Sequence, residues 1–226
     1  EIAADGGGIV RTVDATRRAS EEEPAAAARG RLDEMLACGT TTAEAKSGYG
    51  LTTDAELRQL RDIRLLDAEH PIDLVPTFMG AHEVPPEYRS RRSDYVQLVI
   101  REMIPRVEAE RLAERWDVFC ETGDFTAEES GTILCARLLG GTQARIHADE
   151  LGASGGSRVA AQVGARSADH LIFVNEEGAD LMARAGVCAT LLPAAAFYLK
   201  IGRFAPARML FEQGVPLALA TDVDPG

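Results

Sequence analysis

Short apolar or β-branched runs recur along the chain, and stretches with helical spacing of apolar residues separate them. Runs of this kind are typical of buried β-strands. We predict seven strands, over residues 40–45, 74–78, 116–120, 144–147, 167–171, 187–192 and 216–221.

Helices are predicted in the intervals between these strands. Residues 8–36 have helical character, and a second helix is predicted to begin at Thr53. Glu56 follows Thr53 by three residues, which is the spacing of a capping box, and Thr126 and Glu129 repeat the pattern. The other predicted helices cover 96–107, with a kink or break at Pro105, and 155–164, 175–185 and 206–213.

Strands that alternate with helices indicate right-handed βαβ units and a parallel sheet. We interpret the seven strands as part of an α/β fold, a (β/α)8 TIM-type barrel. Residues 1–226 are expected to form this one barrel domain, incomplete at both ends, with the first strand missing upstream. A doubly wound open sheet is the alternative, but no G-x-G-x-x-G motif follows any predicted strand.

Composition and charge exclude several classes of protein. The chain has 226 residues, 46% of them hydrophobic, and a formal net charge of −12. A nucleic-acid partner is not expected, because phosphate binding requires a basic face. No apolar run approaches the ~20 residues that span a bilayer, and no signal peptide is visible. We therefore expect no membrane contact. The four cysteines form no C-x-x-C pair, so we expect reduced thiols and a cytoplasmic protein.

Polar residues gather where the predicted strands end. Barrel enzymes place their chemistry at the carboxyl ends of the strands. Three of the four histidines, His82, His147 and His170, fall at such ends, as do Glu150 and Asp222. The remaining histidine, His70, precedes a proline at a helix end and is interpreted as solvated.

Imidazole and carboxylate groups with an open position suit a hydrolytic zinc or iron centre. Such a metal lowers the pKa of bound water to about 7 and polarises a carbonyl group. His147 and Asp222 are the ligand candidates. Two protein ligands are too few for such a centre, so the missing first strand is expected to supply the others.

Five motifs together resemble the imidazolonepropionase family of the amidohydrolase superfamily. The resemblance extends from about Gly6 to Gly226. Singly each motif is weak, but their order and approximate spacing match the family. The motifs cover residues 46–51 (KSGYGL), 80–88 (GAHEVPPEY), 147–150 (HADE), 167–171 (SADHL) and 220–226 (ATDVDPG).

The resemblance implies a metal-bearing (β/α)8 barrel with a small β-sandwich whose segments this chain lacks. It implies hydrolysis of 4-imidazolone-5-propanoate, a small-molecule substrate, to N-formimidoyl-L-glutamate, with one zinc or iron ion per subunit. A His-x-His pair upstream would complete the ligand set, and the protein is expected to be a homodimer.

The resemblance also implies the roles of individual residues. His147 and Asp222 would bind the metal. Glu150 and His170 would transfer protons, and Asp222 is a further candidate for this step. The substrate-binding set would be Tyr49, His82, Glu150, Asp224 and Gly226.

One departure from the family pattern leaves alternatives open. Members usually have Asn at the position of Asp224, and a carboxylate only accepts hydrogen bonds whereas an amide also donates them. A related amidohydrolase that acts on another cyclic amide or amidine is therefore an alternative. A catalytically incompetent fragment is another, because the expected His-x-His strand is missing.

Overall fold

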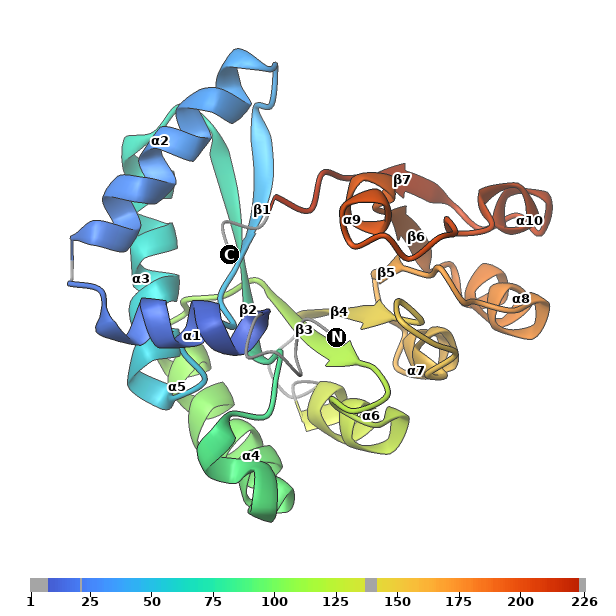
Figure 1. The fold of residues 1–226 in the computed structure, drawn as a ribbon, viewed down its shortest axis with the longest axis horizontal. Helices are drawn as coiled ribbons and strands as arrows, with labels where there is room; N and C mark the ends of the chain where they lie inside the picture. Colours follow the sequence, from blue (N-terminus) through green and yellow to red (C-terminus); the bar gives the residue numbers. More distant parts are fainter. Residues whose placement is uncertain (1–7, 21, 137–141, 224–226) are drawn as a thin grey trace. The chain divides into compact units, whose positions relative to one another are not determined.

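The structure, a computed structural model, describes residues 8–20, 22–136 and 142–223 (Figure 1). These residues form two compact units, one that ends at Arg115 and one that begins at Trp116. Within each unit, neighbouring strands are consecutive along the chain. All seven predicted strands are present among the described residues, and helices alternate with them.

Two parallel strands form the sheet of the first unit. β1 (Thr42–Lys46) pairs with β2 (Asp73–Ala81), so that Thr42 lies opposite Asp73 and Lys46 opposite Thr77. The α-helices of this unit are α1 (Ile9–Arg18), α2 (Glu23–Ala37), α3 (Thr53–Glu69), α4 (Arg92–Leu98) and α5 (Ile104–Ala109).

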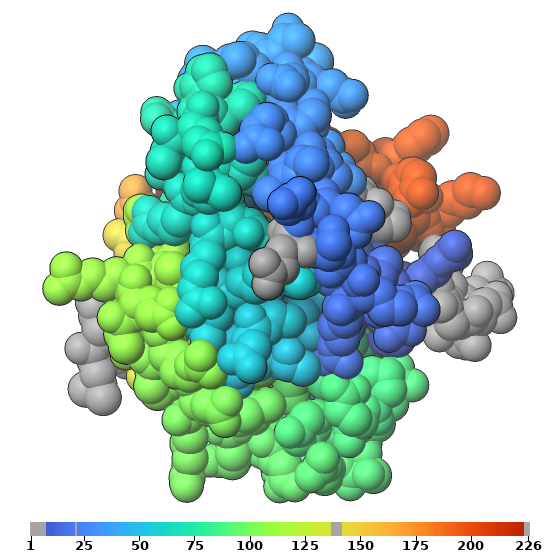
Figure 2. Space-filling view, turned by 90° about the vertical axis from the view of Figure 1, so that its left-hand side faces the viewer, coloured from blue at the N-terminus to red at the C-terminus, as the bar shows by residue number. Residues whose placement is uncertain are grey.

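Helices α2 and α3 pack against each other and against these strands. Leu32 of α2 and Leu66 of α3 form a buried apolar cluster with Ile72 and Leu74 at the start of β2. Figure 2 shows α2 and α3 side by side on the outer face of this unit. The burial of one apolar stripe on each helix therefore holds the helical layer on the sheet.

The second unit contains the remaining strands, and parallel pairing is recorded from β4 through β7. The strands are β3 (Arg115–Cys120), β4 (Gln143–Ala148), β5 (Ser167–His170), β6 (Cys188–Leu191) and β7 (Leu217–Leu219). The helices are α6 (Ala127–Ala136), α7 (Gly156–Gln162), α8 (Glu176–Ala185), α9 (Pro193–Tyr198) and α10 (Ala207–Glu212). None of the helices in the described part of the chain is long and apolar enough to cross a membrane.

The single helical segment predicted over 8–36 is wrong in its middle. Ala19, the residue after α1, is extended, with φ −62° and ψ 144°. Pro24 lies in the first turn of α2, where its missing N–H group costs no hydrogen bond. The polar stretch between the two helices therefore contains a break. The prediction also omitted α9, which begins at Pro193.

One of the two predicted capping boxes forms. The Thr126 hydroxyl accepts from the Glu129 N–H (3.2 Å), and Glu129 Oε2 accepts from the Thr126 N–H (2.9 Å). The predicted box at Thr53 is wrong. Thr52 caps α3 by accepting from the Ala55 N–H, and the Glu56 side chain turns towards a loop instead.

The predicted kink or break at Pro105 corresponds to an irregular turn in a helix whose backbone stays helical. A π-helical turn over Val99–Met103 separates α4 from α5, and Pro105 lies in the first turn of α5. Proline cannot donate to the carbonyl group four residues earlier and collides with it in a regular α-helix. The wider turn before Pro105 relieves both constraints.

We predict that Gly156→Ala destabilises the second unit. A Cβ atom on Gly156 would lie 2.6 Å from the Ala148 Cβ and 2.9 Å from its Cα, so α7 would have to move off β4. Overpacking of this kind typically costs about 1–3 kcal/mol. The midpoint of urea unfolding should fall with an unchanged m value.

The matched control is Gly131→Ala, in the interior of α6. The nearest atom to an added Cβ there is Val159 Cγ1, at 3.9 Å, so the variant should be stabilised by about 0.5–1 kcal/mol. Equal midpoints for the two variants would contradict the close approach of α7 to β4.

Candidate metal centre

Three potential metal ligands converge at the carboxyl ends of the strands of the second unit. His147 lies near the end of β4, His170 ends β5, and Asp222 follows β7. One donor atom from each lies within 4.8 Å of the others. Both imidazoles are buried, whereas the Asp222 side chain is 33% exposed. Two imidazole nitrogens and one carboxylate oxygen are a donor set that suits a hydrolytic metal ion.

Asp117 of β3 orients His147. The Asp117 carboxylate is fully buried, and its Oδ1 lies 3.1 Å from Nδ1 of His147. An ionised carboxylate only accepts hydrogen bonds, so Nδ1 carries the proton and Nε2 is the ligand atom. Sequence reasoning missed Asp117 as a functional residue. The feature of the sequence that could have identified it is a single charged residue inside the apolar run 116–120.

A second group of potential ligands overlaps the first. Asp117, His147 and Asp169 are all buried and also bring donor atoms within 4.8 Å of one another. Asp169 accepts from the Ser167 hydroxyl at 3.0 Å. Because Asp117 already binds the Nδ1 side of His147, the group that includes His170 and Asp222 fits a metal better.

His170 lies between two carboxylates. Its Nδ1 is 3.4 Å from Oε1 of Glu150, and its Nε2 is 3.9 Å from Oδ2 of Asp222. The imidazole is 3% exposed, so solvent screens these electrostatic interactions weakly. Both carboxylates therefore favour the protonated imidazolium form of His170 electrostatically.

Several residues at these strand ends have a left-handed backbone. The φ angles are 51° for Asp149, 71° for His170, 57° for Leu171 and 57° for Asp222. Non-glycine residues seldom adopt φ > 0, and the surrounding structure must stabilise them there. The Leu171 N–H, for example, donates to the carbonyl of Ala148 at 3.0 Å.

The environment of the Glu150 carboxyl group shifts its pKa towards neutral pH. Burial, together with the nearby carboxylates of Asp222 and Glu121, raises its pKa to about 7, although His147 opposes the shift. A carboxyl group with this pKa can both accept and donate a proton near pH 7. Glu150 therefore has the electrostatic environment of a general acid or base.

Glu121 holds the loop that carries Glu150. Its buried Oε2 accepts from the backbone N–H groups of Glu150 (3.0 Å), Leu151 (2.8 Å) and Gly152 (3.4 Å). Its other oxygen accepts from the Thr122 N–H at 2.7 Å. Glu121 directly follows β3, and the sequence analysis did not identify it as a functional residue.

Two further predicted site residues lie together in the first unit. The rings of Tyr49 and His82 meet edge to face, with centroids 5.0 Å apart. Nδ1 of His82 lies 3.2 Å from the carbonyl oxygen of Gly48. Asp224 and Gly226, the other predicted substrate contacts, lie outside the described residues.

His70 differs from its prediction. It does end α3, but its side chain is only 5% exposed rather than solvated. Its Nδ1 accepts from the Ile72 N–H at 3.2 Å, and its Nε2 lies 3.3 Å from Asp33. These contacts give His70 a structural role at the helix end.

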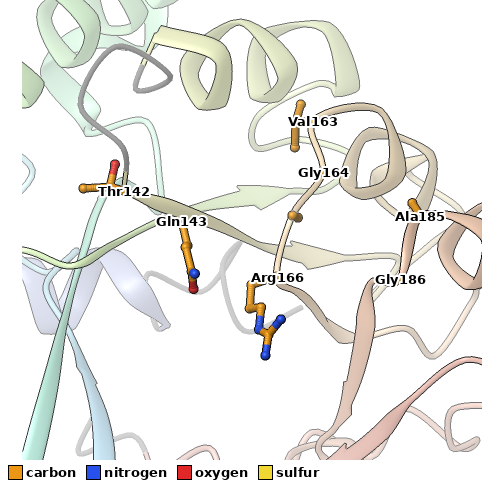
Figure 3. Close-up of a pocket in the computed structure, with 8 residues that line it drawn as sticks. Thr142, Gln143, Val163, Gly164, Arg166, Ala185 and Gly186 are labelled. Carbon is orange, nitrogen blue, oxygen red and sulfur yellow. The ribbon is translucent and has the colours of Figure 1, made fainter.

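A pocket of about 390 Å³ lies at the amino-terminal beginnings of β4, β5 and β6, away from the metal ligands at the strand ends (Figure 3). Among the described residues that line it, the charged one is Arg166, which directly precedes β5. The acids and imidazoles described above do not line it. The chemistry of this unit is therefore concentrated at the opposite ends of these strands.

Comparison with curated proteins identifies close relatives. An imidazolonepropionase of Alkaliphilus metalliredigens is 50% identical over 226 residues, which is all of this chain and 54% of that protein. An imidazolonepropionase of Shouchella clausii is 53% identical over 221 residues, or 98% of this chain and 49% of that protein. The chain thus spans about half the length of these relatives. No protein-family model matches it.

Solved structures share the fold at low sequence identity. A 5-methylcytosine deaminase from Klebsiella pneumoniae matches with a TM-score of 0.74 and 14% identity, covering 96% of this chain and 56% of that one. An amidohydrolase from Burkholderia ambifaria with bound Zn matches with a TM-score of 0.65 and 17% identity, covering 89% and 58%. The predicted fold class, the (β/α)8 barrel of the amidohydrolases, is confirmed, and the doubly wound sheet is not favoured.

We predict that His147→Ala and Asp222→Ala each abolish stoichiometric metal binding by the whole protein, because each removes a donor atom from the cluster. Asp117→Asn should weaken metal affinity about 10–100-fold, since it alters the group that orients His147. Metal analysis after dialysis against graded chelator measures both effects. Asp180→Asn, on the exposed side of α8, is the control. Full metal content in both alanine variants would refute the ligand assignment.

We predict that Glu150→Gln stabilises the metal-free protein more at pH 8 than at pH 5. The folded-state pKa of Glu150, about 7, lies above the ordinary 4.5, so folding favours the protonated form. The protonated side chain contributes fully to the free energy of unfolding below pH 4.5. This contribution is lost as the pH rises through 7, by up to about 3 kcal/mol. Glutamine cannot ionise and avoids that loss.

Urea unfolding at the two pH values, with chelator present, measures this difference. Glu177→Gln is the matched control, because its carboxylate is 63% exposed on α8. A stability difference between Glu150→Gln and the parent that does not change with pH would contradict the raised pKa.

Proposed function

Because this chain is a homologue of the imidazolonepropionases along its whole length, we propose that the whole protein opens the ring of 4-imidazolone-5-propanoate by hydrolysis. Water adds across a ring C–N bond: the carbon gains the oxygen, the nitrogen gains a proton, and N-formimidoyl-L-glutamate results. The observation that carries this proposal is sequence identity near 50% over the complete chain.

The metal donor set supports the proposal. We propose that His147 and Asp222 hold one zinc or iron ion per subunit, with Asp117 fixing the His147 ring. Such an ion supplies a Lewis acid and a water activated at neutral pH.

Glu150 and His170 are the proposed proton carriers. Hydrolysis of a cyclic amide requires a proton to be removed from water and another to be delivered to the leaving nitrogen. With a pKa of about 7, Glu150 can accept the first proton and return it. His170 lies 3.4 Å from Glu150 and can stabilise the charge that develops on the substrate oxygen.

Tyr49 and His82 are proposed to contact the substrate. Since the Gly48 carbonyl can only accept a hydrogen bond, Nδ1 of His82 is the protonated nitrogen, and a neutral ring presents Nε2 as an acceptor. An acceptor suits the N–H groups of an imidazolone ring.

We predict that the whole protein consumes imidazolonepropionate and that chelator removal of the metal abolishes this activity. The loss of substrate absorbance measures it directly. His170→Ala and Glu150→Gln should each lower kcat by about 10²–10⁴-fold, the usual contribution of a general acid or base.

Glu177→Gln should leave kcat unchanged, because this residue is exposed on α8. Near-normal kcat in both site variants would reject their catalytic roles. Turnover of a different cyclic amide, with none of imidazolonepropionate, would instead support a related amidohydrolase.

A further inference from the structure

A fully buried carboxylate organises the loop that carries Tyr49. Glu56 belongs to the first turn of α3 and is 0% exposed. Its Oε2 accepts from the Gly48 N–H (2.9 Å), and its Oε1 accepts from the N–H groups of Gly50 (2.9 Å) and Leu51 (2.8 Å). Backbone amides on both sides of Tyr49 are thus bound to one side chain.

Other groups complete the enclosure of Glu56. The Ser47 hydroxyl also hydrogen-bonds its carboxylate, and that hydroxyl oxygen accepts from the Met79 N–H (3.0 Å). Burial raises the pKa of Glu56, and its hydrogen bonds to the loop oppose the rise. Ionised oxygens that accept several donors form stronger hydrogen bonds than neutral ones.

The loop is also held through its carbonyl groups. Arg17 Nε donates to the Gly50 carbonyl at 2.7 Å, and Arg17 pairs with Glu87 at 2.9 Å. The Gly48 carbonyl lies 3.2 Å from Nδ1 of His82. Glu56 therefore connects to His82 through a single residue, Gly48, whose N–H group binds Glu56 and whose carbonyl group lies beside His82.

Glycine is required at Gly48 for this path. Its φ of +109° is strained for any other residue. A Cβ atom there would lie 2.8 Å from the Met79 carbonyl oxygen and 3.1 Å from the His82 ring nitrogen. The loop approaches β2 and His82 too closely to admit a side chain.

We propose that Glu56 is a positioning residue for substrate binding: it fixes the Tyr49 loop and, through Gly48, the orientation and tautomer of the His82 ring. The inference rests on the proposed function, in which Tyr49 and His82 contact the substrate. Glu56 touches neither the substrate nor the reacting atoms and acts only through the loop.

Glu56→Gln tests this assignment with little change in volume. An amide has one acceptor oxygen, and its NH2 group must face a donor wherever it points. If the oxygen stays with Gly50 and Leu51, the NH2 group faces the Gly48 N–H and displaces Gly48, the residue whose carbonyl group lies beside His82. This orientation disrupts fewer hydrogen bonds than its reverse.

The expected result is a rise in KM of about tenfold, corresponding to ~1.4 kcal/mol, with kcat nearly unchanged. Nitrogen-15 NMR of histidine-labelled protein should show the Nδ1–H tautomer of His82 in the parent and its loss in the variant. The His82 signal is assigned by its absence in His82→Asn. Glu69→Gln, at the exposed end of α3, should change neither quantity.

The outcomes separate this inference from the proposed function. A lower melting temperature with unchanged KM and an unchanged His82 tautomer would overturn the positioning role. If the parent does not turn over imidazolonepropionate, the proposed function fails, and the NMR arm still decides whether Glu56 controls His82. Should Glu56→Gln not fold, Ser47→Ala removes a single donor to the carboxylate, and a smaller rise in KM with a shift in the His82 signal is expected.

Discussion

Parallel hydrogen bonding between strands is the constraint on which the candidate metal centre depends. When β4 and β5 pair in parallel, His147 lies opposite Asp169 and Ala148 opposite His170. Each helix returns the chain to the same edge, so polar residues at successive strand ends meet without long loops. The burial of helix faces on the sheet supplies the stability, and the strand ends are left for chemistry.

Acidic side chains hold the loops at these strand ends by accepting backbone N–H groups. Glu121 binds the loop of Glu150, and Glu56 binds the loop of Tyr49. Asp149 similarly accepts from the N–H groups of Gly155 and Ser157 at the start of α7. Buried amides without partners are costly, and a carboxylate satisfies several at once. The same residues that satisfy the backbone thereby place functional side chains.

The electrostatic consequence is a concentration of buried acidic groups in the second unit. Asp117, Glu121 and Glu150 are all buried in the second unit. Burial, with repulsion from Asp222 and Glu121, accounts for the raised pKa of Glu150. A bound metal ion would offset this repulsion, so the fold and the proposed cofactor are energetically linked.

The sequence by itself determined the seven strands, the alternation with helices, the irregular helix before Pro105 and the strand-end positions of His147 and His170, because these follow from local periodicity and proline chemistry. Only the tertiary structure decided what Asp117, Glu121 and Glu56 bind. Glu56 illustrates the reason: its spacing from Thr53 matches a helix cap, yet a loop closing over α3 offers it three backbone amides. A local pattern records which hydrogen bonds a side chain can make, and only the packed chain determines which donors reach it.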